Sequence, residues 1–561
     1  MGRKIPMWQV ALVMLFTILA LMYSMDVLQK IANLIMGQDP ATQNAFSCGY
    51  GALHIPLICS AVIAGLVAIL NGYKWSFLEA GILASINRSM QAMLILLTVG
   101  LLIGSWIAAG VVPTMIYYGL MILKPSIFLL AGCVLCCIVA LATGSSWTTA
   151  GTIGIALIGI GQGLGIEPAM TAGAIVSGAY FGDKMSPLSD TTNLAPAIAG
   201  SNLFDHIRHM VWTVTPSILI ALIIYGIMGM GVSNDVDMGN VTAIQEGLSD
   251  TFVITPWLLL PPIVVILIVA LKLPALPGLL GGILLGCILG SIFQGVTLGE
   301  WPGILHSGYV FEVSESFNAL TTSLTADSKA ALEVLELGGQ TVRPSDILDL
   351  DSDVFMGLAQ DLGWTADIQT QFNLSKLLTR GGMESMLWTI NLIICAMCFG
   401  GIMDASGMLA SLATSMLKFV RNTGSLVTIT VFSCIFMNVI AADQYLSIIL
   451  PGRMYKEAWE DKRLDPKNLS RALEDAGTIT SALVPWNTCG ATMQTFLGVQ
   501  TWGGPGGGYG RYAFLNLINP LISIFYGFTG ISMTKMSDEQ YEKILAARAK
   551  EKAEALKSLE A

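Results

Sequence analysis

Charged residues are scarce in this chain, and their scarcity excludes an ordinary soluble globular protein. Only 12% of the 561 residues are charged, whereas 54% are hydrophobic. A typical soluble domain carries about 25% charged residues. The mean hydropathy is +0.69. We therefore expect an all-α polytopic membrane protein, with the lipid bilayer as its surroundings.

An excess of basic residues, metal-ligand spacing of the cysteines and nucleotide-binding loops are lacking as well. The net charge of −10 argues against a nucleic-acid partner. Several of the ten cysteines lie within apolar stretches: Cys133, Cys136, Cys137, Cys287, Cys395 and Cys398. This placement is typical of packing side chains, not of a zinc site or a disulfide framework. The glycine-rich GGPGGGYG at 503–510 lacks the G-K-[ST] ending of a phosphate-binding loop. We expect no cofactor and no enzymatic activity.

Long apolar runs are what the sequence has in abundance. Runs of about 20 residues, the length that spans a bilayer, lie near 5–27, 46–70, 92–112, 211–232, 252–271, 274–294, 384–404 and 512–533. The first run is too long for the apolar part of a signal peptide, so we expect it to be retained as a span. Four other apolar stretches are interrupted by polar residues: 125–164, 166–200, 424–452 and 469–500.

The distribution of Lys and Arg predicts the orientation. The 453–471 loop and the C-terminal tail from Lys535 are rich in basic residues, and Arg3 and Lys4 precede the first span. The 233–250 loop has acidic but no basic residues, and 295–383 has an acidic excess. We therefore expect both termini in the cytoplasm and the two acidic segments outside.

The two halves of the chain resemble each other. SMQAML at 89–94 matches GMESML at 382–387, and Pro187 matches Pro485 at a similar offset. Because corresponding segments are predicted on opposite sides, we expect two inverted repeats. Each contains a re-entrant hairpin and a discontinuous helix, a pattern typical of secondary transporters.

This interpretation divides the chain into six parts. They are a first transmembrane helix with an external loop at 1–45; repeat 1 at 46–200, with hairpin 125–164 and broken helix 166–200; connecting transmembrane helices at 201–273; repeat 2 at 274–500, with an external insertion at 305–380, hairpin 424–452 and broken helix 469–500; a last transmembrane helix at 501–534; and a cytoplasmic tail at 535–561.

The interrupted stretches concentrate polar side chains at membrane depth. Non-helical backbone there must be buried in protein or line a wet cavity. The four breaks offer neutral oxygens from Thr148, Thr149, Thr191, Asn193, Asn438, Asn487 and Thr488, and carboxylates from Asp183, Asp190 and Asp443. A cage of such oxygens with one or two carboxylates suits a hard cation, and we expect Asp190 and Asp443 to be metal ligands for Na⁺.

A carboxylate away from water suits a proton equally well. A group that holds either Na⁺ or H⁺, but not both, is sufficient for antiport. Glu474 and Asp475 are candidates for a proton relay or an ion entry on the cytoplasmic side, and a solvated helix start is the competing interpretation. For Asp183 the competing interpretation is an ion pair with Lys184 that shapes the turn.

A carrier of a small organic anion or amino acid, coupled to Na⁺ or H⁺, is the alternative function. It must neutralise a substrate carboxylate, and Lys184 is the clear basic residue within the polar motifs. Backbone N–H groups at the ends of half-helices could take that role.

Three segments carry a family resemblance. GDKMSPLSDTTNLAP at 182–196, EDAGTITSALVPWNTCG at 474–490 and LLTRGGMESMLWTINLIICAMCFGGIMDASGML at 377–409 resemble the NhaC family of sodium/proton antiporters. The likeness runs from about residue 45 to about residue 530. It implies inverted repeats and the expulsion of Na⁺ or Li⁺, driven by H⁺, across a bacterial plasma (inner) membrane.

The resemblance also assigns ion-binding residues by matching motif. They are Asp183, Ser186, Asp190, Thr191, Thr192 and Asn193 in the first half and Asn487 and Thr488 in the second. The 305–380 insertion departs from the family in its length and suggests an external cap or an oligomer contact. We expect a homodimer. Relatives that exchange sodium and lactate for protons and malate share the same motifs, so the alternative function stays open.

Overall fold

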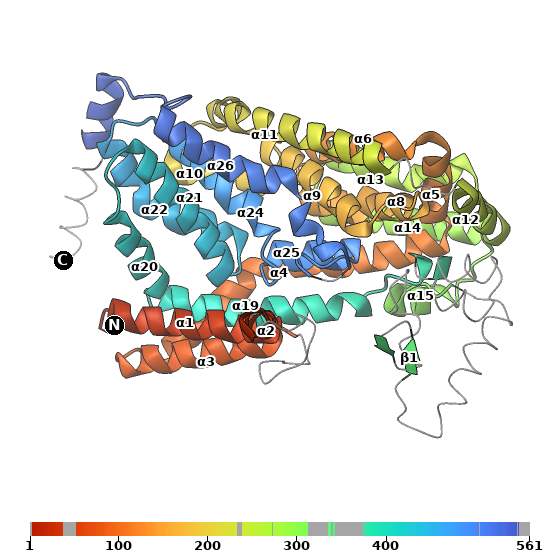
Figure 1. Ribbon diagram of the computed structural model, residues 1–561, viewed down its shortest axis with the longest axis horizontal. Coiled ribbons are helices and arrows are strands. Elements are labelled where there is room, and N and C mark those ends of the chain that lie inside the picture. The colour runs from red at the N-terminus through yellow and green to blue at the C-terminus, as the bar shows by residue number, and fades with distance from the viewer. Residues whose placement is uncertain are drawn as a thin grey trace.

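The computed structural model describes residues 3–36, 52–232, 238–271, 273–311, 335–337, 340–342, 374–375, 377–503, 505–546 and 548. The described chain is mainly helical, and most of its long helices run along the longest axis of the molecule (Figure 1). Strands β1 (Leu335–Leu337) and β2 (Gln340–Val342) form a short antiparallel pair. Most of the predicted 305–380 insertion lies outside the described residues.

Helices of the first half follow one another with short connections. They are α1 (Met7–Ser24), α2 (Val27–Met36), α3 (His54–Leu70), α4 (Trp75–Ala108), α5 (Val111–Ile122), α6 (Pro125–Thr143), α7 (Ser146–Thr149), the π-helical turn η1 (Ala150–Gly154), α8 (Ile155–Gly163), α9 (Pro168–Met185), α10 (Asp190–Ala199) and α11 (Leu203–Val232).

The remaining described elements are also mainly helices. Its elements are α12 (Met238–Thr251), η2 (Pro256–Leu259), α13 (Leu260–Ala270), α14 (Ala275–Phe293), α15 (Trp301–Ser307), η5 (Glu384–Met386), α19 (Leu387–Ala405), α20 (Met408–Leu417), α21 (Thr423–Ile440), α22 (Gln444–Asp461), α23 (Pro466–Leu473), the π-helical turn η6 (Glu474–Thr478), α24 (Ile479–Ser481), α25 (Thr488–Leu497), η7 (Pro505–Gly507), η8 (Tyr509–Arg511) and α26 (Phe514–Thr529).

The predicted polytopic membrane architecture is confirmed. Among the described residues, seven helices are long and apolar enough to cross a bilayer, and they belong to α1, α4, α6, α11, α14, α19 and α21. On α14, Leu280, Leu284, Ile288 and Ile292 are all exposed along one face. An apolar face of this kind is what a helix presents to lipid.

Some predicted spans differ from the helices observed. The run near 92–112 lies largely within α4, which begins much earlier, at Trp75. The run near 252–271 begins at a bend: the helix before it, Val241–Thr251, and the helix that forms most of it, Pro256–Ile268, meet at 99°. The extended Thr255 and Pro256, the first residue of η2, interrupt helical geometry at this bend.

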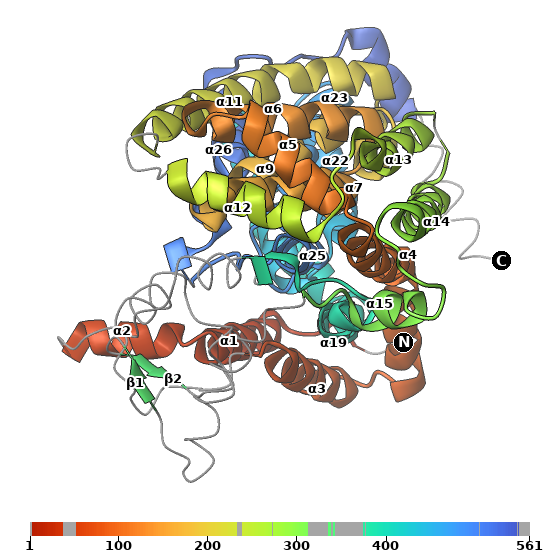
Figure 2. The ribbon, with the colours of Figure 1, turned by 90° about the vertical axis from the view of Figure 1, so that its right-hand side faces the viewer.

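Loops predicted to be cytoplasmic and loops predicted to be external lie at opposite ends of the molecule. The start of α1, the α22–α23 connection and the end of α26 lie toward the left in Figure 1, whereas α12 and α15 lie at the right; Figure 2 looks at that right-hand end. Segments predicted to be cytoplasmic and external thus gather at opposite ends. Which end faces the cytoplasm stays a prediction.

The first half is interrupted where the sequence predicts. Helix α6 ends at Gly144, which has φ = +68°, and Ser145 caps α7 by accepting a hydrogen bond from the backbone N of Thr148 at 3.2 Å. Helix α9 ends before Pro187, and α10 begins at Asp190. We call residues 144–149 the first tip and residues 182–193 the first break.

Glycine brings the first tip and the first break together. A Cβ atom on Gly182 would lie 2.3 Å from the backbone N of Leu141 and 2.4 Å from the Cβ of Ala140. The absence of a side chain therefore lets the end of α9 lie against the end of α6. The next residue, Asp183, consequently reaches the first tip.

The second half has the same order of helices and interruptions. Helix α21 ends at Ile440, and Asp443 caps α22 by accepting a hydrogen bond from the backbone N of Leu446 at 2.8 Å. Asn487 caps α25 by accepting one from the backbone N of Cys489 at 3.0 Å. We call residues 438–444 the second tip and residues 482–490 the second break.

Helix α22 continues to Asp461, beyond the predicted end of the second apolar hairpin at 452. Hydropathy marks where the apolar run stops, whereas the helix continues into the polar 453–461 segment. The order of elements agrees with two repeats. Their inverted relation, the re-entrant character of the hairpins and the six-part division stay predictions.

Gly144 provides a test of the first tip. In Gly144→Ala, the new Cβ would lie 2.6 Å from the Cβ of Leu188 and 3.0 Å from the backbone N of Ser189, at a positive φ. We expect a loss of stability of at least about 1–2 kcal/mol, measured as a lower melting temperature of the detergent-purified protein.

Ala442 in the second tip is the matched control. It adopts φ = +53° without being glycine, so Ala442→Gly should leave the melting temperature unchanged or raise it slightly. A wild-type melting temperature for Gly144→Ala would contradict the close contact between tip and break.

Candidate functional site

The carboxylate of Asp183 joins the first tip to the first break. Its Oδ2 accepts hydrogen bonds from the backbone N of Ser146 at 3.1 Å and from the Ser146 Oγ at 2.6 Å. Its Oδ1 accepts one from the Ser189 Oγ at 2.5 Å. The buried charge of Asp183 is therefore compensated by hydroxyl and backbone donors, as a buried carboxylate requires.

Several side chains of the first break that are predicted to bind an ion instead donate hydrogen bonds to backbone carbonyls of the same break. The Thr192 Oγ1 donates to the carbonyls of Asp183 at 3.1 Å and Lys184 at 2.9 Å. The Asn193 amide donates to the carbonyls of Pro187 and Ser189. Hydrogen bonds of this kind stabilise an interrupted helix where no water is available.

The other first-half residues differ in how they are bonded. The Ser186 Oγ accepts from the backbone N of Leu188 at 3.3 Å, and the Thr149 Oγ1 donates to the Ser145 carbonyl at 2.9 Å. The Thr191 Oγ1 lies 3.2 Å from the Ser189 Oγ. The buried Thr148 Oγ1 has no hydrogen-bond partner among the described residues.

Asp190 is exposed instead of buried. It is the first residue of α10 and lies close enough to Asp183 and Tyr445 for electrostatic interaction. Its carboxylate is therefore at the accessible edge of the first break, whereas Asp183 lies inside. Asp443 is likewise within electrostatic range of Tyr445.

Amide side chains join the second tip to the second break. The Asn487 Nδ2 donates to the Asn438 backbone O and Oδ1, both at 3.1 Å. The backbone N of Thr488 donates to the Ala442 carbonyl at 3.0 Å, and the Trp486 Nε1 donates to the Val439 carbonyl at 2.6 Å. The second half thus uses asparagines where the first half uses a carboxylate and two serines.

A buried ion pair connects the two halves. The Lys184 Nζ donates to the Asp475 Oδ1, and both side chains are fully buried. The alternative ion pair between Lys184 and Asp183 is therefore wrong. The solvated helix start considered for Glu474 and Asp475 is also wrong, because both residues are fully buried in η6.

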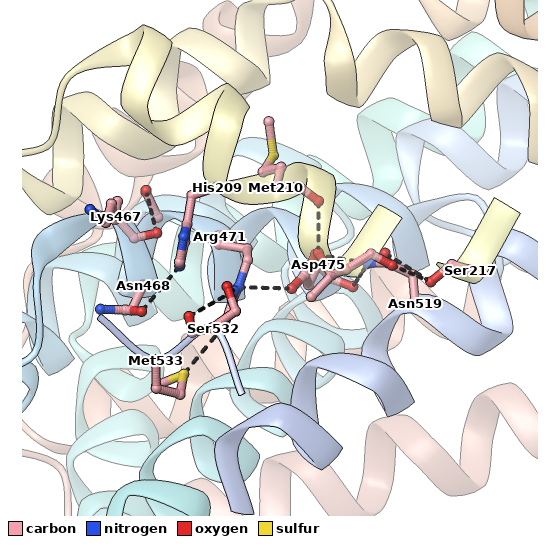
Figure 3. Close-up of polar contacts among 12 residues, drawn as sticks. His209, Met210, Ser217, Lys467, Asn468, Arg471, Asp475, Asn519, Ser532 and Met533 are labelled. Atoms are coloured by element: carbon pink, nitrogen blue, oxygen red, sulfur yellow. Dashed lines mark hydrogen bonds and ion pairs between the residues drawn. The ribbon is translucent and has the colours of Figure 1, made fainter. Parts of the chain in front are cut away.

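Three residues outside the predicted site complete the surroundings of Asp475, and Figure 3 labels two of them, Arg471 and Asn519. The Thr213 Oγ1 on α11 donates to Asp475 at 2.8 Å, and the Asn519 Nδ2 on α26 donates at 2.9 Å. The Arg471 Nε lies 3.9 Å from the Asp475 Oδ2. Polar side chains inside otherwise apolar spans were the sequence signal that could have identified Thr213 and Asn519.

Arg471 also holds the segment that follows α26. Its Nη1 donates to the Ser532 carbonyl at 3.1 Å and to the Ser532 Oγ at 2.8 Å. Nearby, the His209 Nε2 lies 3.1 Å from the Asn468 Oδ1 (Figure 3). These contacts attach α11, α23 and the 530–534 segment around the buried ion pair.

Carboxylates outnumber cations at these junctions. Asp183, Asp443, Glu474 and Asp475 are buried, together with Lys184 and Arg471. Both cations contact Asp475. In the described part of the chain, no group of three His, Cys, Asp or Glu side chains is arranged to hold a metal ion. The chemistry available here is that of single carboxylates with hydroxyl and carbonyl oxygens, which suits a hard monovalent cation.

Comparison with known proteins identifies the family. The model of the Na⁺/H⁺ antiporter family matches residues 178–330 and 359–531. The Na⁺/H⁺ antiporter NhaC of Alkalihalophilus pseudofirmus is 34% identical over 86% of this chain and 91% of its own. The malate-2H⁺/Na⁺-lactate antiporter of Bacillus subtilis is 34% identical over 88% of this chain and 93% of its own. The arginine/ornithine antiporter ArcD of Halobacterium salinarum is 33% identical over 87% of this chain and 89% of its own.

The matched regions include both polar motifs, 182–196 and 474–490, and therefore both breaks and the buried ion pair between them. The resemblance to the NhaC antiporters is confirmed, and the chain belongs to the Na⁺/H⁺ antiporter family.

Proposed function

We propose that this chain exchanges Na⁺ or Li⁺ for H⁺ across a membrane by alternating access, with the ions competing for carboxylates of the tips and breaks. The observation that carries the proposal is the excess of buried carboxylates over buried cations at the junctions. Ionisable residues inside a membrane protein usually mark an ion pathway. Because Lys184 and Arg471 both contact Asp475, the remaining negative charge favours a cation as substrate.

The mechanism uses each tip and its break together as an ion site. Each break is hydrogen-bonded to the tip of its own half, through Asp183 in the first and Asn487 in the second. A tip and its break therefore move together. Lys184 and Asp475 link the two units across the halves, and a shift between the units would expose the carboxylates to one side and then the other.

The proposal also covers the orientation in the membrane and the oligomeric state. Basic loops at one end of the molecule support cytoplasmic termini in a bacterial plasma membrane, with H⁺ moving in as Na⁺ moves out. Asp190 and Asp443 would coordinate Na⁺ together with neutral oxygens of the tips and breaks. Asp475 and Glu474 would pass protons. The homodimer predicted from the sequence stays a prediction.

Exchange of an organic anion or amino acid is the second candidate. The observation that favours it is that relatives of nearly equal identity are a malate/lactate antiporter and an arginine/ornithine antiporter. Against it, both buried cations at the junctions are engaged by Asp475, so a substrate carboxylate would depend on backbone N–H groups at the ends of half-helices.

Proteoliposomes separate the two candidates. The purified protein is reconstituted with a trapped pH dye, a pH gradient is imposed, and NaCl, LiCl, KCl or choline chloride is added. We expect proton movement with Na⁺ or Li⁺ alone. The same assay is repeated with malate, lactate and a set of amino acids. A response that requires an organic solute together with Na⁺ would establish the second candidate.

Asp190→Asn tests the first break. The N-cap of α10 is Ser189 and not Asp190, and the Asp190 side chain is exposed, so folding should be unaffected. We expect Na⁺-dependent proton movement to be lost in the proteoliposome assay, with an unchanged melting temperature. Asp250→Asn, an exposed aspartate on α12, is the control and should transport normally. Normal exchange by Asp190→Asn would show that Na⁺ does not need this carboxylate.

Asp443→Asn tests whether the second half contributes charge. Because asparagine can also cap α22, the variant removes the charge and keeps the tip. We expect the apparent affinity for Na⁺ to fall about tenfold, equivalent to about 1.4 kcal/mol. The initial rate of proton movement as a function of Na⁺ concentration measures it. An unchanged affinity would leave the second half with neutral ligands alone.

A further inference from the structure

Glu474 is the buried carboxylate that the described structure leaves without a partner. Its side chain is fully buried, and neither Oε1 nor Oε2 has a hydrogen-bond partner among the described residues. The other buried carboxylates at the junctions are bonded: Asp183 to two serines, Asp443 to the start of α22, and Asp475 to Lys184. Glu474 therefore has the whole of its acceptor capacity available.

A further oxygen without a hydrogen-bond partner among the described residues, that of Thr478, lies in the same helical turn as Glu474. Glu474 is the first residue of the π-helical turn η6, and the last residue of that turn is Thr478. The Thr478 Oγ1 is also buried and without a hydrogen-bond partner in the described chain. Single π-helical turns within α-helices are rare and occur frequently at functional sites.

The neighbours of Glu474 come from several helices. The hydroxyls of Thr478 and Thr191 are its polar neighbours, and neither bonds to Glu474 at hydrogen-bond geometry. The charged groups that act on it are Lys184 and Asp183 on α9, and Cys434 on α21 faces it as well. The ammonium of Lys184 is engaged by Asp475. The described surroundings of Glu474 therefore offer it oxygens, not a dedicated counter-charge.

An ionised carboxylate in this position is strongly unfavourable unless a positive charge compensates it. A small cation that prefers oxygen ligands can compensate the charge of the Glu474 carboxylate in these surroundings. The two carboxylate oxygens and the two threonine hydroxyls are ligands of the type that Na⁺ takes.

We propose that Glu474, Thr478 and Thr191 form a Na⁺-binding site between η6 and the start of α10. The proposal rests on the proposed function, because it assumes that Na⁺ is a substrate. It places one of the transported ions deeper than the exposed Asp190, in the second half of the chain and against the first break. Glu474 is then a Na⁺ ligand in addition to a proton relay.

Direct binding tests the site without transport. The full chain, purified in detergent, is titrated with ²²Na⁺ at constant ionic strength kept with choline chloride, and its melting temperature is recorded over the same series. We expect saturable binding by the wild type. Glu474→Gln should bind Na⁺ at least about tenfold more weakly and lose the Na⁺-dependent rise in melting temperature.

Two substitutions of Thr478 test the site further: one removes the hydroxyl, and the other keeps it and should therefore keep Na⁺ binding. Thr478→Val keeps the shape of the side chain and removes the hydroxyl, and we expect several-fold weaker binding. Thr478→Ser should restore wild-type binding, which a purely structural role of the threonine methyl would not allow. Thr98→Val is the matched control, since the buried Thr98 hydroxyl on α4 donates to the carbonyl of Leu94 at 2.8 Å.

The outcomes separate this site from the proposed function. Saturable binding by the wild type together with wild-type affinity in folded Glu474→Gln or folded Thr478→Val overturns the site and leaves the proposed function standing. No saturable Na⁺ binding by the wild type overturns both. If Glu474→Gln does not fold, the Thr478→Val and Thr478→Ser pair decides.

Discussion

Where the helices of this chain stop inside the protein, backbone N–H and C=O groups must find partners without water. The structure supplies them by placing each break against the tip of the same half. In the first half the donors and acceptors are Asp183, Ser146 and Ser189. In the second half they are Asn438 and Asn487, with the backbone of Ala442. The polar motifs are dense because every interrupted helix needs several such partners at one place.

The same requirement explains why few polar side chains remain available for an ion. Thr192 and Asn193 donate to carbonyls of the first break, and Asp443 and Asn487 cap helices. A residue in an ion-binding motif can therefore serve the backbone first. The groups left unbonded, Glu474 and Thr478 above all, are more informative about ion binding than the composition of the motif.

The buried charges are arranged around Asp475. Lys184, Thr213, Asn519 and Arg471 approach it from α9, α11, α26 and α23. Removing one partner of such a group leaves an uncompensated buried charge, which is strongly destabilising. The ion pair thus links the two halves, and it engages the Lys184 ammonium with Asp475, so that Glu474 has no ion-pair partner of its own among the described residues. Structure and ion chemistry depend on the same side chains.

The amino-acid sequence by itself determined the membrane class, the positions of the breaks and the residue types at each break. These depend on local properties: the length of apolar runs, and the inability of Pro187 and of the Gly144 region to continue a helix. It also led to the family, because the two polar motifs are continuous in sequence.

Tertiary structure alone decided which polar groups meet. Lys184 pairs with a residue 291 positions away and not with its neighbour Asp183, and Thr213 and Asn519 join the same group from outside both motifs. Asp190 is exposed although its motif is largely buried. The physical reason is that burial and ion pairing depend on how distant helices pack, and neither the composition nor the spacing of a segment contains that information.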